Sequence, residues 1–192
     1  AKVHRLASGG RAIVGCDLRV VAPDDRDVPV GTSGEIVVAG PTVMKGYWNQ
    51  PELTAEALRG GYMHTGDAGY LDADGYVYVS DRIKDMIVTG GENVYSIEVE
   101  NAVLTHPAIR ECAVIGVPHP LWGEAVHAVV TFKAGQSATA DAIIAHCKAR
   151  IAGFKCPQTI EVRDVMPLSQ ANKILKTELR QPHWGGRNRQ VN

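Results

Sequence analysis

The feature that most constrains this sequence is a change of pattern near residues 81–85. Upstream, β-branched runs such as those at 12–22 and 34–40 alternate with turns rich in glycine, proline and aspartate. Downstream, helix-like segments alternate with apolar, strand-like ones. Because these two patterns build different kinds of core, the sequence predicts an α+β protein in two parts. We place a β-rich part at 1–82 and a small α+β domain at 83–192.

The β-rich part carries local turn and helix signals. The tetrapeptide Asp72-Ala73-Asp74-Gly75 separates two strand-like runs, so a β-hairpin is expected over 70–80. A short helix is expected at 51–59, because Pro51 suits a first helical turn and the glutamates that follow favour helix.

The second part should contain strands and helices in alternation. The expected elements are a strand at 86–88, a loop at 89–91, a helix from an N-cap at Ser96 to Leu104, strands at 113–117 and 125–132, a helix capped by Thr139, a strand at 159–165 and a helix at 174–180. Ser and Thr are favoured N-caps because their side-chain oxygens accept hydrogen bonds from the first free backbone N–H groups. Residues 182–192 have little apolar content and are expected to be loosely ordered.

Composition excludes several classes of partner. The chain has 192 residues with 20 Lys and Arg against 21 Asp and Glu, so it has no broad basic field for nucleic acid or an anionic membrane. No apolar run reaches the roughly 18 residues of a transmembrane helix. The four cysteines show no CxxC pair and no metal-ligand spacing, so we expect reduced thiols and a cytoplasmic location.

Common catalytic motifs are missing, and three clusters remain. The sequence has no GxxxxGK[ST] or GxGxxG loop, no nucleophile elbow and no HExxH pair. In the first cluster, glycines bracket Asp67, which could accept hydrogen bonds from ribose hydroxyls or simply fix its own turn. The second cluster is the charged segment 81–85 with Gly90 and Gly91, which could equally be a solvated linker. In the third cluster, Lys173 stands between a loop and a helix and could be an ordinary surface lysine.

The order and the residues of these clusters resemble the motifs of the adenylate-forming superfamily. This superfamily includes acyl-CoA synthetases, peptide-synthetase adenylation domains and luciferases. The similar segments are 34–37 with 46–54, His64-Thr65-Gly66-Asp67, residues 81–85 with 90–95 up to Glu98 and Glu100, and Asn172-Lys173-Ile174-Leu175-Lys176. The resemblance extends from about residue 11 to residue 180. Within the superfamily, the motif sequences are most similar to those of medium- and long-chain fatty-acid–CoA ligases.

The resemblance implies an adenylation reaction with named residues. A carboxylate, expected to be a fatty acid, would displace pyrophosphate from ATP to give an acyl-adenylate, and the CoA thiol would then release AMP. Asp67 would bind both ribose hydroxyls, and Arg82 would contact the same ribose or a nearby phosphate. Lys173 would reach the substrate carboxylate and the α-phosphate, where a cation typically lowers a barrier by about 3 kcal/mol or more.

The resemblance also implies a change of domain orientation between the two half-reactions. Lys84 would be the hinge about which the C-terminal domain rotates, withdrawing Lys173 from the site. The rotation would bring Gly90 and Gly91 to the path of the CoA pantetheine, where bare backbone leaves room for the thiol arm.

Two departures from the family pattern set further expectations. Asn172 stands where the family usually has glycine; asparagine tolerates a positive φ, so the turn before Lys173 should survive. The family's phosphate loop, its magnesium motif and its acyl pocket have no counterpart here. The resemblance therefore implies the C-terminal portion of a longer acid–thiol ligase, with Mg²⁺ ligands upstream and no turnover by these 192 residues alone. An enzyme that loads a carrier-protein thiol and a non-catalytic nucleotide-binding module are the alternatives.

Overall fold

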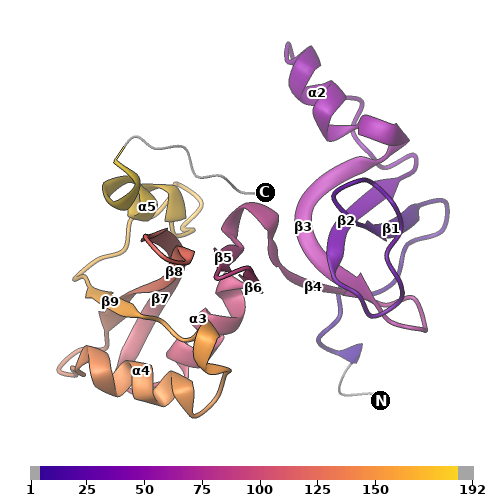
Figure 1. The fold of residues 1–192 in the computed structure, drawn as a ribbon. Helices are drawn as coiled ribbons and strands as arrows, with labels where there is room; N and C mark the ends of the chain where they lie inside the picture. Colours follow the sequence, from indigo (N-terminus) through magenta and orange to yellow (C-terminus); the bar gives the residue numbers. More distant parts are fainter. Residues whose placement is uncertain (1–4, 186–192) are drawn as a thin grey trace. The chain divides into compact units, whose positions relative to one another are not determined.

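The structure is a computed structural model that describes residues 5–185. The chain forms two compact units, Ala1–Lys84 and Asp85–Asn192. The secondary structure is mixed in the α+β manner that the sequence predicts (Figure 1).

The first unit is built on a four-stranded antiparallel sheet in the order β1-β2-β3-β4. Its elements are β1 (Asp17–Val21), β2 (Gly34–Ala39), α2 (Pro51–Ala57), the 3₁₀ turn η1 (Arg59–Gly61), β3 (Met63–Leu71) and β4 (Val77–Arg82). The 3₁₀ turn η2 (Ile83–Asp85) follows and contains the boundary between the two units. The side chains of Val20, Ile36 and Val77 form the small core of the first unit. Of the β-branched run at 12–22, only the five residues of β1 form a strand.

The predicted hairpin and helix of this unit are confirmed. Strands β3 and β4 pair with Leu71 opposite Val77. Asp72 closes the turn between them, because its Oδ1 accepts hydrogen bonds from the backbone N–H groups of Asp74 and Tyr76, each at 2.9 Å. Helix α2 begins at Pro51, whose missing N–H costs nothing in the first helical turn.

The second unit is built on a five-stranded sheet. Its path is β6-β5-β8-β7, and β9 pairs in parallel with β8. The elements are β5 (Ile87–Thr89), β6 (Glu92–Val94), α3 (Ser96–Leu104), β7 (Ile109–His119), β8 (Gly123–Phe132), α4 (Ala140–Lys148), the 3₁₀ turn η3 (Gly153–Lys155), β9 (Thr159–Val162) and α5 (Lys176–Trp184).

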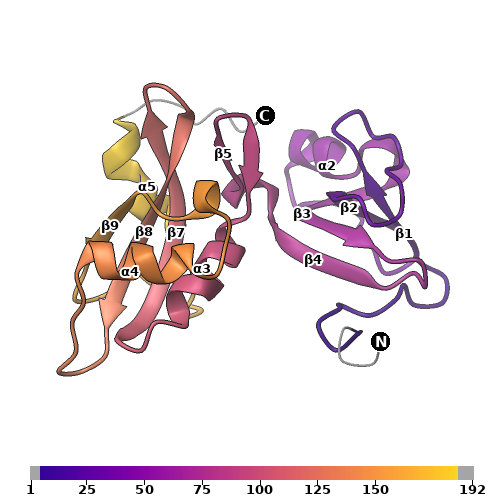
Figure 2. The same cartoon turned by 60° about the horizontal axis from the view of Figure 1, so that its bottom comes forward.

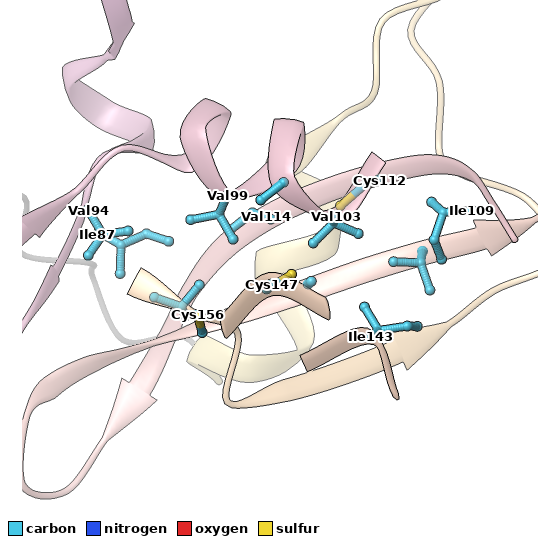
Figure 3. Close-up of a cluster of buried hydrophobic side chains, with 14 residues drawn as sticks. Ile87, Val94, Val99, Val103, Ile109, Cys112, Val114, Ile143, Cys147 and Cys156 are labelled. Carbon is cyan, nitrogen blue, oxygen red and sulfur yellow. The ribbon is translucent and has the colours of Figure 1, made fainter. Parts of the chain in front are cut away.

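Helices cover both faces of this sheet (Figure 2). On one face α3 and α4 enclose the main core, in which Val103 and Cys147 pack against Val114 of β7 (Figure 3). On the other face Leu179 of α5 packs with Ile115 and other apolar side chains. Burying apolar surface at roughly 25 cal/mol per Å² is the main force that holds these layers together.

Several details of the second unit differ from the sequence expectations: β9 ends at Val162 instead of residue 165, and α5 spans Lys176–Trp184 instead of 174–180. Thr139 caps α4 as predicted, because its Oγ1 accepts the backbone N–H of Ala142 at 3.2 Å. Ser96 is not the N-cap of α3; Tyr95 holds that position, and Ser96 is the first helical residue. Residues up to Trp184 belong to α5 instead of a loose tail, and the rest of that tail, 186–192, lies outside the described residues. Over residues 5–185, no helix has the length and apolar character that crossing a membrane requires.

Candidate functional site

Asp67 and Arg82 lie side by side in the first unit. They are directly opposed in the register of β3 and β4, and Arg82 Nε lies 3.2 Å from Asp67 Oδ1. The Asp67 side chain is 32% exposed and that of Arg82 is 58% exposed. The pair therefore presents hydrogen-bond acceptors and donors to a ligand from solvent.

The glycine-rich segment around Asp67 is a bulged strand and not the expected turn. Thr65, Gly66 and Asp67 of β3 stand opposite Ile36 alone, because the register shifts between Glu35 and Val37. Gly66 takes a φ of 70°, a conformation that costs other residues about 1–2 kcal/mol. The bulge re-aims the strand where Asp67 leaves it, as bulges near functional sites commonly do.

Glu35 of β2 holds this bulge in place. Its Oε1 accepts the backbone N–H of Gly66 at 3.1 Å, and its Oε2 lies 2.9 Å from Nδ1 of the buried His64 ring. Thr65 donates its hydroxyl to the carbonyl of Ile36 at 2.7 Å. Glu35, His64 and Gly66 also line a shallow hollow beside α2. No role for Glu35 was predicted from the sequence, although this residue lies within a segment that resembles the family.

The charged segment 81–85 ends the first unit and begins the second. Lys84 lies in the 3₁₀ turn η2 and is the last residue of the first unit. Asp85, the first residue of the second unit, forms an ion pair with Arg180 of α5 at 2.6 Å, and both side chains are largely buried. The backbone thus passes from a strand to an anchored carboxylate within three residues.

Gly90 and Gly91 form the two-residue connection of the β5–β6 hairpin. Their φ angles are 59° and 85°, as in the hairpin turns that favour glycine at both central positions. The Gly90 N–H donates to the carbonyl of Trp122 at 3.0 Å, and the Trp122 ring stacks on that of His119. The turn therefore offers bare backbone next to an aromatic side chain.

Lys173 stands at the tip of a tight, well-braced loop. The carbonyls and N–H groups of Ser169, Asn172 and Lys173 close it, with Ser169 N to Lys173 O at 2.8 Å and Asn172 N to Ser169 O at 2.9 Å. Leu168 and Ile174 form an antiparallel bridge just behind it. Asn172 has a φ of 59°, which confirms that asparagine takes the left-handed conformation expected here. Across residues 5–185 the exposed Lys173 side chain has no ion-pair partner.

A second lysine anchors this loop to the sheet and to α3. Lys176 Nζ lies 2.7 Å from Glu100 Oε1 and donates to Ser96 Oγ at 2.7 Å. Glu100 Oε1 also accepts the backbone N–H of Val114 at 2.8 Å. The sequence did not predict this network, because it joins residues about 80 positions apart.

The candidate residues thus form separate groups within each unit. Asp67 and Arg82 are brought together in the first unit, whereas Lys173 and the Gly90–Gly91 turn occupy different loops of the second. In the part of the chain that the structure describes, the only close group of three His, Cys, Asp or Glu ligand atoms contains two histidines and one glutamate. Two of its three ligand atoms are imidazole nitrogens, whereas Mg²⁺ prefers oxygen ligands.

Comparison with known proteins identifies the class. Residues 1–48 match the AMP-binding enzyme family, and residues 98–173 match the AMP-binding enzyme C-terminal domain. A feruloyl-CoA synthase from an Amycolatopsis species is 48% identical over 92% of this chain and 36% of its own length. A long-chain-fatty-acid–CoA ligase from Escherichia coli is 41% identical over 92% of this chain and 31% of its own.

A solved structure agrees with these relatives. The o-succinylbenzoate CoA synthetase from Bacillus subtilis, in complex with its acyl-adenylate intermediate, has a TM-score of 0.87 at 36% identity. The match covers 93% of this chain and 36% of that one. The chain belongs to the adenylate-forming, or AMP-binding, superfamily. More particularly, these relatives are acid–CoA ligases, and the chain spans about a third of their length.

Proposed function

We propose that these residues belong to an ATP-dependent acid–CoA ligase, and that they supply its ribose-binding hairpin and its mobile C-terminal domain. The observation that carries this proposal is Lys173, which is exposed at the tip of a braced loop and has no ion-pair partner among residues 5–185. A lysine held out by a rigid loop is suited to reach charge that develops on a bound substrate. We assign residues 1–82 to the end of the large AMP-binding domain and residues 83–192 to the C-terminal domain.

In the proposed first half-reaction, a substrate carboxylate oxygen attacks the α-phosphorus of ATP and the bond to pyrophosphate breaks. Asp67 accepts hydrogen bonds from the two ribose hydroxyls, while Arg82, 3.2 Å away, fixes the carboxylate and contacts the same nucleotide. The Lys173 ammonium binds the substrate carboxylate and the α-phosphate, where negative charge accumulates. Mg²⁺ would neutralise phosphate charge, with ligands from the upstream part of the enzyme.

In the proposed second half-reaction, the CoA thiolate attacks the acyl carbonyl and AMP leaves. We propose that the C-terminal domain turns about Lys84 between the two steps, which removes Lys173 and brings the Gly90–Gly91 turn to the thiol path. The absence of side chains at that turn supports this role, because pantetheine is long and thin. A moving domain would let one site serve two reactions.

For the acid itself we propose a fatty acid, because the sequence motifs are similar to those of fatty-acid–CoA ligases. The relatives include enzymes named for feruloyl and long-chain fatty acyl groups, so the acid must be tested as a panel. Turnover of octanoate and palmitate above that of ferulate and succinylbenzoate supports a fatty acid. The reverse order contradicts it while leaving the ligase proposal intact.

The test of the ligase proposal separates the two half-reactions. In the complete polypeptide produced from the native gene, Lys173→Ala should lower acid-dependent ATP–pyrophosphate exchange at least about 100-fold. The same variant supplied with synthetic acyl-adenylate and CoA should form thioester at close to the wild-type rate. The matched control Lys148→Ala removes an exposed lysine from α4 and should change neither rate.

Each of the other outcomes would favour a different function for this protein. Equal loss of both half-reactions would contradict the assignment of Lys173 to adenylation. Adenylate formed normally but transferred only to a carrier-protein thiol would identify the alternative acceptor. Nucleotide binding without any acid-dependent exchange would identify a non-catalytic module.

A further inference from the structure

Three possible metal ligands converge on the face of the second sheet that α5 covers. His127 lies on β8, Glu161 on the adjacent parallel strand β9, and His183 in the last turn of α5. The ligand atoms of the three residues all lie within 4.8 Å of one another. His127 Nε2 is 3.5 Å from Glu161 Oε2, and His183 Nε2 is 3.8 Å from the same oxygen.

Among residues 5–185, the Nε2 atom of each imidazole in this cluster has no hydrogen-bond partner. Nε2 of His127 and Nε2 of His183 are both buried and unsatisfied, and the His127 side chain is only 7% exposed. A buried polar atom without a partner typically costs about 1–3 kcal/mol, so such atoms call for an explanation. Here both atoms lie within 3.8 Å of the same carboxylate oxygen, Oε2 of Glu161.

The other nitrogen of His127 indicates how the ring is set. Its Nδ1 lies 2.7 Å from Oγ1 of Thr159, which is two residues before Glu161 on β9. In the tautomer whose Nδ1 donates to Thr159 Oγ1, the Nε2 lone pair is available to bind a cation beside the Glu161 carboxylate, 3.5 Å away. A hydrogen bond on the outer nitrogen is the usual support of a metal-binding histidine.

We propose that His127, Glu161 and His183 form a binding site for a divalent transition-metal ion of the Zn²⁺ class. Two imidazoles and one carboxylate are a common zinc ligand set. Bonds of about 2.0–2.1 Å in a tetrahedral arrangement place ligand atoms roughly 3.3–3.4 Å apart. The imidazole nitrogens lie 3.5 and 3.8 Å from the carboxylate oxygen and all three atoms lie within 4.8 Å of one another, so a metal would draw the side chains slightly closer together. This proposal does not depend on the ligase activity.

Charges around the site set the expected affinity. Arg163 Nε bonds the other oxygen of Glu161, Oε1, at 2.5 Å, which leaves Oε2 available. The guanidinium also places a positive charge near the ion, so binding should be weaker than in sites built for zinc alone. The Glu161 and His183 side chains are about a third exposed, which gives the ion a route from solvent and a water for its fourth position.

A bound ion would fasten the end of α5 to two strands. Helix α5 begins three residues after Lys173 and carries Lys176 and Arg180, which hold the loop and Asp85. Trp184 already pins the helix end by donating Nε1–H to the Gly116 carbonyl at 3.1 Å. The attachment of the end of α5 to β8 and β9 would then depend on the concentration of free zinc.

The test titrates ZnCl₂ into the EDTA-treated and dialysed chain, in competition with a chromogenic chelator. The proposal expects one equivalent bound and a rise in the melting temperature, whereas MgCl₂ produces neither. Glu161→Gln and His183→Gln should each weaken binding by more than about 100-fold, since outer-shell partners alone contribute roughly 10- to 100-fold. Thr159→Val, which changes only such a partner, should weaken it about tenfold or more.

A control variant and a folding check separate loss of the zinc site from loss of the fold. His146→Gln alters the His106–His146 ring contact of this unit, which belongs to no group of three possible metal ligands among the described residues, and should leave zinc binding unchanged. Circular dichroism checks that each variant is folded, and ¹⁵N spectra of the histidine rings should show zinc shifting Nε2 of His127 and His183. No binding at 100 µM zinc, or equal binding by wild type and folded His183→Gln, would overturn the site.

Discussion

Lys176 and Glu100 form an ion pair of 2.7 Å that ties the start of α5 to α3. Both side chains are largely buried, and Glu100 also accepts a backbone N–H from β7. The loop that carries Lys173 is therefore anchored to α3 and β7 by Lys176, three residues after Lys173. Rigid support of this kind is what holds a catalytic group within the narrow geometry that catalysis needs.

Replacing Lys176 with methionine should damage both stability and adenylation. The change leaves a largely buried carboxylate without its cation, which should cost about 2–3 kcal/mol in the free energy of unfolding, somewhat less than for a fully buried pair. Adenylation should fall while the adenylate-to-thioester step is retained. Urea denaturation and the two half-reaction assays measure this, with Lys148→Met as the exposed control. Adenylation unaffected by a folded Lys176→Met protein would show that the loop holds itself.

Asn172 should be replaceable by glycine but not by a β-branched residue. Its φ of 59° suits glycine and asparagine, whereas valine at this angle should cost about 1–2 kcal/mol or more. Asn172→Gly should keep adenylation within about threefold of wild type, and Asn172→Val should lower it at least tenfold. If the two variants were equally active, the left-handed turn would have no part in placing Lys173.

Gly91 should matter for thioester formation more than for adenylation. Its φ is 85° with open space around the position of an added Cβ, so the cost of Gly91→Ala comes from the backbone alone, about 1 kcal/mol or more. Gly135 has a φ of 71° and the same open surroundings in a turn elsewhere, so Gly135→Ala is a matched control. Both variants should lose similar stability, but only Gly91→Ala should slow transfer from adenylate to CoA. Similar rates for both would argue against the pantetheine path.

Local interactions explain why parts of this fold could be predicted from the sequence. Thr139 caps α4 and Asp72 closes its hairpin turn through bonds to residues two to four positions away. Ser96 has the same local signal as Thr139, yet its hydroxyl bonds Lys176 80 residues later, and Tyr95 takes the cap position. A distant partner thus overrode a local preference.

The candidate site divides in the same way. The positive φ of Asn172 follows from residue type, and the pairing of Asp67 with Arg82 follows once the hairpin is known. The glycines near Asp67 suggested a turn, but their freedom serves a bulge that only the register with β2 reveals. The cluster of His127 and Glu161 requires the parallel pairing of β8 with β9, which no periodicity encodes.

The four cysteines should differ sharply in reactivity. Cys112, Cys147 and Cys156 are buried, and burial raises the pKa of the Cys147 thiol to about 11. Since the thiolate is the nucleophile, these three should react with a disulfide reagent only after unfolding. Cys16 is partly exposed, so one thiol should react in the native chain at pH 8 and four in guanidinium. Fast reaction of more than one native thiol, assigned by mass spectrometry, would contradict the described core.

Glu35 should control nucleotide affinity without touching the nucleotide. Its carboxylate accepts the Gly66 N–H and pairs with His64, so Glu35→Ala leaves the bulge beneath Asp67 without its support. The lost hydrogen bonds should cost about 2–3 kcal/mol of stability. Because Asp67 is displaced but present, the KM for ATP should rise about tenfold with a smaller change in kcat. Glu56 lines the same hollow from α2 with an exposed side chain, and Glu56→Ala should leave both constants unchanged. Glu35→Gln keeps an acceptor for Gly66 and should recover most of the affinity; a KM as high as that of Glu35→Ala would mean that the charge, and not the bulge, carries the effect.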